Sequence, residues 1–198
     1  MTYQSAWKVH LELIVVGLAT VVSTSYGQLP EDLKRKFDES ERRIVRLSPT
    51  AFPELPGNVV RELQRRGCTI PQEDYSKKPH NVVKGHFVRP GQTDWAVLCS
   101  VDGFSSILVF WNGSEKNPAE IAKVEDRGFL QGDVGDKINY SRGIRPVGTE
   151  FIMTHFKAYG GPKPPPIDHQ GIDDAFIEKA SVTHYFHAGK WLRLTGAD

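Results

Sequence analysis

The amino-acid sequence predicts an α+β fold that consists mainly of antiparallel β-sheet, with a short N-terminal helix packed on the sheet and a charged helix before it. Two observations predict this class. From about residue 82 onward, apolar and polar side chains alternate in short runs separated by glycine-containing turns, as they do in antiparallel strands. Residues 31–47 and 59–66 instead place their apolar side chains at helical spacing.

The composition fits one compact domain. Of 198 residues, 39% are hydrophobic and 25% are charged, which is too apolar for a disordered chain. Lysine and arginine total 25 against 24 acidic residues, a balance that argues against a dedicated nucleic-acid-binding protein. No stretch reaches the roughly 18 to 20 consecutive apolar residues of a transmembrane helix, so we expect no transmembrane segment in the mature chain.

The N-terminus has the three-part pattern of a secretory signal peptide. Residues 1–12 are weakly basic, residues 13–22 read LIVVGLATVV, and small residues precede a cleavage site between Gly27 and Gln28. The alternative is a buried N-terminal helix. We expect residues 1–27 to be a signal peptide, which places the mature protein in the periplasm or the extracellular space.

A charged lead-in is expected to follow, over residues 28–57. Its first part, residues 31–47, holds eleven charges of both signs and a narrow apolar stripe, which predicts a solvated helix or a tether. The stripe consists of Leu33, Phe37, Ile44 and Leu47. Three prolines between residues 49 and 56 then break any helix. We therefore expect a single α+β domain over residues 58–198.

The first helix of that domain is expected over residues 59–66, with Asn58 as its N-cap and Gly67 just past its end. Cys68 follows, and Cys99 is the second cysteine of the chain. An oxidising compartment would join them in a disulfide closing a loop of about 30 residues, worth on the order of 3 kcal/mol. The alternative is two buried free thiols. The disulfide would attach the end of the helix to the sheet.

The sheet is expected to be centred on one hairpin. Residues 95–99 and 107–111 alternate in the manner of strands, and Val101-Asp102-Gly103 between them is a turn signal. Both faces of this hairpin are apolar, so we expect it in the middle of the sheet.

The remaining elements are predicted from the same signals. A single helical turn or two is expected at residues 173–179, and the run of prolines at residues 162–166 predicts a surface loop. Ala188-Gly189 is expected to close a C-terminal hairpin. Further strands are expected at residues 82–88, 150–157, 180–187 and 190–195.

The segment from Gly85 to Leu98, GHFVRPGQTDWAVL, resembles the FG-GAP type of repeat found in integrin-like propellers. Residues 88–90 depart from that pattern, because Val-Arg-Pro stands where the repeat has acidic calcium ligands. We therefore do not carry calcium binding over to this chain. One copy cannot form a propeller, which needs several blades. The matching positions are Gly85, Phe87, Gly91, Asp94 and the strand that follows.

Residues 58–198 as a whole resemble uncharacterised exported bacterial proteins that carry one such degenerate repeat. The shared features are Gly-Cys-x-Ile-Pro-Gln at residues 67–72 and, within residues 172–191, an acidic Ile/Phe-rich segment, Lys-Ala-Ser, a Tyr-containing strand and Gly-Lys-Trp. The resemblance implies export and an α+β domain, and it implies no known activity.

Three function classes remain open. The first hypothesis is an exported, non-catalytic domain with a binding or envelope-associated role, for which we expect no metal and no cofactor. The second is a hydrolase or metal-dependent enzyme using His155, Asp168 and His169, although no recognised ligand spacing is present. A pocket that brings these three within hydrogen-bonding reach would favour it. The third is a peptide-binding module that adds a strand at a long, unprotected sheet edge.

Overall fold

The computed structural model describes residues 30–132 and 137–197, and the expected signal peptide at residues 1–27 lies outside them. The described residues form an α+β fold in which every paired strand is antiparallel, as predicted. The helices are α1 (Glu31–Arg43), α2 (Gly57–Arg65) and α3 (Thr149–Tyr159), with 3-10 turns η1 (Pro49–Ala51), η2 (Trp111–Gly113) and η3 (Asp126–Phe129).

Two four-stranded sheets form the body of the protein. The first has the order β3-β4-β5-β6, from Val82–Gly85, Asp94–Val101, Phe104–Phe110 and Ala119–Glu125. The second has the order β12-β11-β10-β9, from Lys190–Ala197, Ala180–His187, Gly171–Phe176 and Arg142–Val147. Two strand pairs complete the described part: β1 (Arg46–Leu47) with β2 (Ile70–Pro71), and β7 (Leu130–Gly132) with β8 (Ile138–Tyr140).

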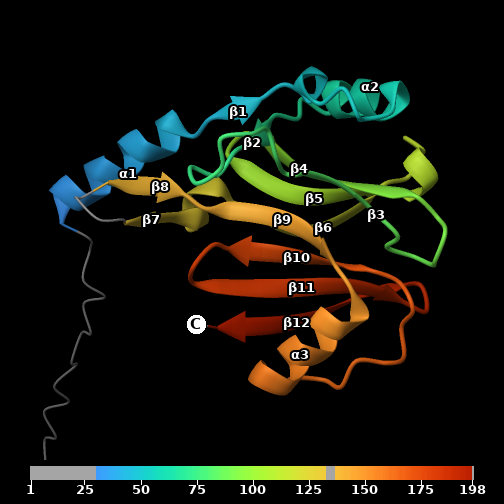
Figure 1. Ribbon diagram of the computed structural model, residues 1–198. Coiled ribbons are helices and arrows are strands. Elements are labelled where there is room, and N and C mark those ends of the chain that lie inside the picture. Colours follow the sequence, from blue (N-terminus) through green and yellow to red (C-terminus); the bar gives the residue numbers. More distant parts are fainter. Residues whose placement is uncertain (1–29, 133–136, 198) are drawn as a thin grey trace, which may run out of the picture.

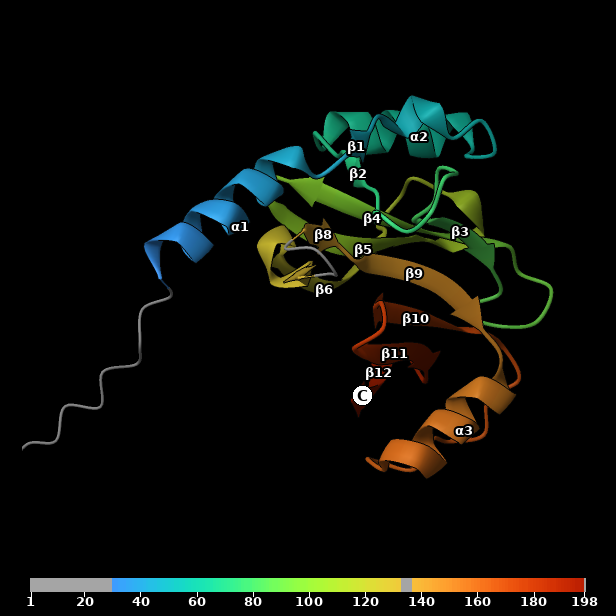
Figure 2. The same ribbon diagram turned by 60° about the vertical axis from the view of Figure 1, so that its left-hand side comes forward.

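The sheets pack face to face, and one helix covers the outer side of each (Figures 1 and 2). Alternate residues of β4 supply the two faces: Ala96 and Leu98 contact the second sheet, whereas Trp95 and Val97 pack against α2. On the other outer face, Ile152 of α3 packs with residues of β11 and β12. The result is four layers with an apolar core at each of the three contacts between them.

The central hairpin is confirmed. β4 and β5 occupy the middle of the first sheet, and both are buried on both faces except at the turn. The turn residues Asp102 and Gly103 have φ angles of 50° and 80°, which two-residue hairpins require. The C-terminal hairpin of β11 and β12 is confirmed as well, and its turn residues Ala188 and Gly189 have φ angles of 48° and 79°.

The prediction of a strand at residues 150–157 is wrong, because this segment belongs to α3. Its inward side chains follow the helical spacing i, i+3, i+4 and i+7 and meet the second sheet. Gly160, with φ of 75°, ends the helix. Hydrophobicity alone does not reveal this pattern, because one of the four residues is a buried histidine and Tyr159 is 52% exposed. The four side chains are Ile152, His155, Phe156 and Tyr159.

The prediction of helical turns at residues 173–179 is also wrong, because residues 171–176 form strand β10. Asp173 and Asp174 are both buried there, which an acidic segment does not lead one to expect. Each is paired with an arginine of the neighbouring strand β9, so the strand is stabilised by partners that are distant in sequence.

Helix α2 begins one residue before Asn58, so the prediction that Asn58 caps it is wrong. The Asn58 amide instead donates to the Gly113 carbonyl, at 2.9 Å, and to the Glu115 carboxylate, at 2.6 Å. The predicted end of the helix is confirmed. The Cys68 N–H donates to the Leu63 carbonyl across a left-handed Gly67, the pattern of a Schellman C-cap.

Helix α1 and the residues after it pack on the domain. The helix ends at Arg43, earlier than predicted, because Arg46–Leu47 pairs with β2. Phe37 and Ile44 pack with the β7–β8 hairpin, while Phe52 and Leu55 enter the core beneath α2. The expected lead-in thus supplies part of the apolar core.

The segment from Gly85 to Leu98 is held closed by one buried carboxylate. Asp94 is fully buried and accepts hydrogen bonds from the backbone N–H groups of Phe87 and Asn112, both at 2.9 Å, and from the Gln92 side chain. Gly85 has no room for a side chain, since a Cβ there would lie 2.5 Å from the Phe87 ring. Glycine, phenylalanine and aspartate are therefore needed here for packing.

The predicted Cys68–Cys99 disulfide is present and joins the end of α2 to β4, with Cα atoms 5.1 Å apart. Replacing both cysteines by alanine should lower the free energy of unfolding by about 3 kcal/mol. The reason is that the disulfide closes a loop of about 30 residues, and without it the unfolded chain gains conformational entropy. Denaturant unfolding with and without a thiol reductant measures this. The reductant should destabilise the native protein and leave the double variant unaffected, and an unchanged native midpoint would contradict the prediction.

Candidate functional site

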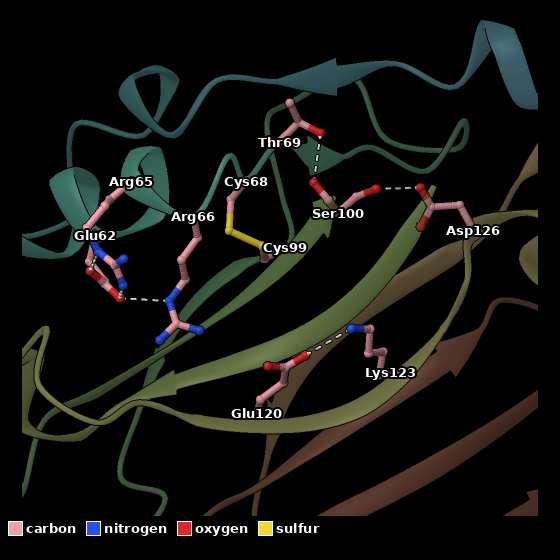
Figure 3. The surroundings of a disulfide bond; sticks show 10 residues. All are labelled: Glu62, Arg65, Arg66, Cys68, Thr69, Cys99, Ser100, Glu120, Lys123 and Asp126. Atoms are coloured by element: carbon pink, nitrogen blue, oxygen red, sulfur yellow. Dashed lines mark hydrogen bonds and ion pairs between the residues drawn. A yellow bond between two sulfur atoms is a disulfide. The ribbon is translucent and has the colours of Figure 1, made fainter. Parts of the chain in front are cut away.

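A cleft of about 380 Å³ opens beside the disulfide, on the outer face of the first sheet (Figure 3). It exists because α2 is short. Trp95 and Phe110 lie opposite each other on β4 and β5, under the helix. Cys99 and Ser106 form another pair on the same face, nearer the turn, and lie beyond the end of the helix. The cleft is lined chiefly by Arg66, Cys99, Phe104, Leu108, Glu120 and Lys123.

The walls of this cleft carry paired charges. Arg66, at the end of α2, donates through Nε to Glu62, at 2.7 Å, and Arg65 donates to the same carboxylate. Hydrogen bonds from Arg65 and Arg66 lower the pKa of Glu62 to about 2. On the opposite wall, Lys123 of β6 lies 4.0 Å from Glu120 (Figure 3). Glu62 therefore stays ionised at neutral pH and holds Arg66 at the mouth of the cleft.

A second cleft, of about 590 Å³, lies on the other side of the β4–β5 turn. It shares Val101 and Asp102 with the first, and its own lining includes Arg42 at the end of α1 and Arg46 of β1. Two apolar side chains that flank the turn are exposed: Val101 by 36% and Phe104 by 44%. The turn thus presents apolar side chains between two clefts that carry charges of both signs.

The floor of the second cleft is anchored by a buried carboxylate. Asp126 is fully buried and accepts hydrogen bonds at one oxygen from Ser100, at 2.6 Å, and from Arg46, at 2.7 Å (Figure 3 shows the first). Ser100 also pairs through its backbone with Thr69. These bonds join β1, β4 and the residue before β2 around the cleft.

Between the two sheets lies a fully buried arginine, Arg142. Its guanidinium makes two bonds to Asp174, at 2.9 and 2.8 Å, two to Ser105, and one to the Ala122 carbonyl at 2.8 Å. All five N–H groups of the side chain are thereby used. The acceptors lie on β5, β6 and β10, and Arg142 itself lies on β9, so one side chain links both sheets.

His184 of β11 lies at the edge of this network. Its Nε2 is 3.9 Å from an Asp174 oxygen and makes no hydrogen bond within the described residues. Burial lowers the pKa of His184, and the positive charges of Arg142 and Arg193 add to that effect, while Asp174 opposes it. The imidazole is therefore held neutral by its surroundings.

The structure places the three histidine and aspartate candidates in different surroundings. His155 is buried on α3 and packs against Gly196, and its Nε2 has no partner within the described residues. Asp168 is exposed, and the His169 ring lies 3.0 Å from the Gln170 carbonyl. Across residues 30–132 and 137–197, no group of three or more His, Cys, Asp or Glu side chains could hold a metal ion.

The edges of the sheets differ in how open they are. The Asn81 side chain bonds the backbone of β9, and β6 is interrupted by a bulge at Ala122, with φ of 55°. Strand β12 is regular along eight residues. α3 and the residues after it pack on one face of β12, where Tyr159 and Gly161 approach Gly196 and Leu194. The outer backbone edge of β12 pairs with no other strand among the described residues.

Arg66, Phe104, Glu120 and Lys123 were not singled out by the sequence. They come from α2, β5 and β6, and no spacing along the chain relates them. Phe104 carried the one available signal, since an aromatic residue directly after an Asp-Gly turn stands where the chain is exposed.

Within the described part of the chain, no helix has the length and apolar character needed to cross a membrane. Comparison with family models, with curated proteins and with solved structures finds no match to this chain.

Arg142→Met should lower the free energy of unfolding by about 3 to 5 kcal/mol, because it leaves the Asp174 carboxylate buried without its cation. Denaturant unfolding measures the loss. Arg65→Gln is the matched control: the Arg65 side chain of the ion pair with Glu62 is 70% exposed, so loss of this pair should barely change stability. Equal effects of the two substitutions would contradict the role assigned to Arg142.

Acidification should destabilise the protein through His184. Its pKa in the folded state lies below the unfolded value of about 6.5, so the unfolded chain binds the proton more readily. The free energy of unfolding should be highest above about pH 7.5 and fall as the pH drops through about 6.5 towards the folded-state pKa. Chemical unfolding from about pH 8 to pH 5 measures the slope. His184→Gln should flatten it, and an unchanged slope in that variant would remove His184 as the cause.

Proposed function

We propose that this protein is an exported, non-catalytic binding domain, and that it binds a polypeptide ligand at the two clefts around the β4–β5 turn. The observation that carries this proposal is the exposure of Val101 and Phe104 between the clefts. Exposed apolar side chains surrounded by polar ones are typical of interaction sites. A polypeptide offers the apolar and charged groups of both signs that such a surface can bind.

Binding fits the chemistry of the clefts better than catalysis does. A general acid or base works best with a pKa near the working pH, and the pKa of Glu62 is shifted far below it. The carboxylate therefore serves to orient Arg66. The alternative of a hydrolase or metal-dependent enzyme needs His155, Asp168 and His169 together, yet Asp168 is exposed while the two histidines are buried among different neighbours.

Export is supported by two independent observations. The first 27 residues have the order of regions found in secretory signal peptides. The disulfide between Cys68 and Cys99 is of the kind that persists in oxidising compartments. We infer that the mature protein works in the periplasm or outside the cell.

Site-specific photocrosslinking in the producing cells tests this function. Phe104→benzoylphenylalanine should give a defined covalent adduct in the exported fraction, identified by mass spectrometry. Tyr75→benzoylphenylalanine is the control, because Tyr75 is a similarly exposed aromatic residue, 40% accessible, away from the clefts. Adding Lys123→Glu to the first variant should reduce the adduct at least tenfold.

Two results would contradict the proposed function. One is the absence of any adduct at position 104, and the other is the same set of adducts at positions 104 and 75. A surface that binds no specific polypeptide would give either result.

A further inference from the structure

We propose that the polypeptide bound at this surface is a second copy of the chain, so that the β4–β5 turn of each protomer enters the cleft beside the disulfide of the other. This inference rests on the proposed function, because it names the partner of the same clefts.

The turn and the cleft are complementary in chemistry. The turn presents Val101 and Phe104, both exposed, on either side of Asp102, which forms no ion pair among the described residues. The cleft offers the cations of Arg66 and Lys123 on its walls, 29% and 65% exposed. Leu108 and Cys99 on its floor are almost completely buried, so the exposed apolar side chains beside the cleft are Val101 and Phe104 themselves, which can pack against their copies in a second chain. A carboxylate entering from another copy would meet both cations.

The same surface is also complementary to itself. Turn and cleft adjoin each other, so a two-fold axis beside the turn brings each turn to the cleft of the other protomer, as in an isologous dimer. The net charge of +1 creates little repulsion between copies.

A purely anionic ligand fits this surface less well than a second copy. Glu41, Asp102 and Glu120 line the clefts together with the cations, and Glu120 lies beside Lys123. These carboxylates would repel a polyanion. A partner that carries charges of both signs around an apolar centre can pair with the carboxylates as well as with the cations of the clefts. The surface itself has that composition.

Sedimentation velocity of the mature, oxidised protein tests the inference, over about 1 µM to about 200 µM. The native protein should pass from monomer to dimer within this range. Asp102→Lys and Lys123→Asp should each weaken association at least tenfold, since each places like charges opposite one another. Phe104→Ala should weaken it to a similar degree, and Tyr75→Ala should leave it unchanged.

Mixing the two charge variants gives the decisive result. Each alone should associate at least tenfold more weakly than the native protein, but together they should form a heterodimer. In that heterodimer the introduced lysine of one variant meets the introduced aspartate of the other at one contact, and the native pair forms at the second. Asp102→Asn, which suits the left-handed turn, removes the charge alone and should also weaken association. Unfolding midpoints near the native value show that the variants fold.

A native protein that stays monomeric throughout, or variants that do not restore each other, would overturn the inference. The photocrosslinking experiment separates this failure from failure of the proposed function. An adduct of position 104 with another copy of the chain supports the dimer. An adduct with a different polypeptide overturns the dimer and retains the binding function, and no adduct overturns both.

Discussion

A charged guanidinium lies fully buried between the two sheets, and its five N–H groups reach acceptors on strands that the chain forms far apart in sequence. Arg142 of β9 bonds Asp174 of β10, Ser105 of β5 and the Ala122 carbonyl of β6. Apolar packing alone would allow the sheets to slide, whereas a planar fork with five fixed directions permits one arrangement. Because both charges are buried, replacing either Arg142 or Asp174 would leave the other charge unpaired and destabilise the fold.

The clefts depend on that arrangement, because the sheets place the edges and turn around which they open. Strand β5 contacts Arg142 on its inner side through Ser105 and lines the first cleft on its outer side through Ser106 and Leu108. The disulfide then sets how much of this outer face is covered. It holds the end of α2 at Cys99, and the sheet beyond that point stays open. Core and surface are therefore coupled through one strand.

The sequence was most reliable where a local signal coincided with burial. Both hairpins were predicted, since Asp102-Gly103 and Ala188-Gly189 suit the left-handed turns that close them. Strand β6 was missed because the bulge at Ala122 breaks its alternation. Strand β9 was missed because the charged Arg142 occupies a buried position and Pro146 lies within the strand. Helix α3 was mistaken for a strand because His155 occupies a buried helical position. The cleft residues were missed since they gather from separate elements.

The sequence by itself determined the α+β class, the two hairpins, the left-handed end of α2 and which two cysteines a disulfide would join. These follow from local backbone preferences, alternation and the count of two thiols. Only the tertiary structure decided that Asp173 and Asp174 lie buried on a strand, and that Val101 and Phe104 stand exposed between two clefts. The reason is physical: the cost of burying a charge, or of exposing an apolar group, depends on partners that the chain brings close only by folding.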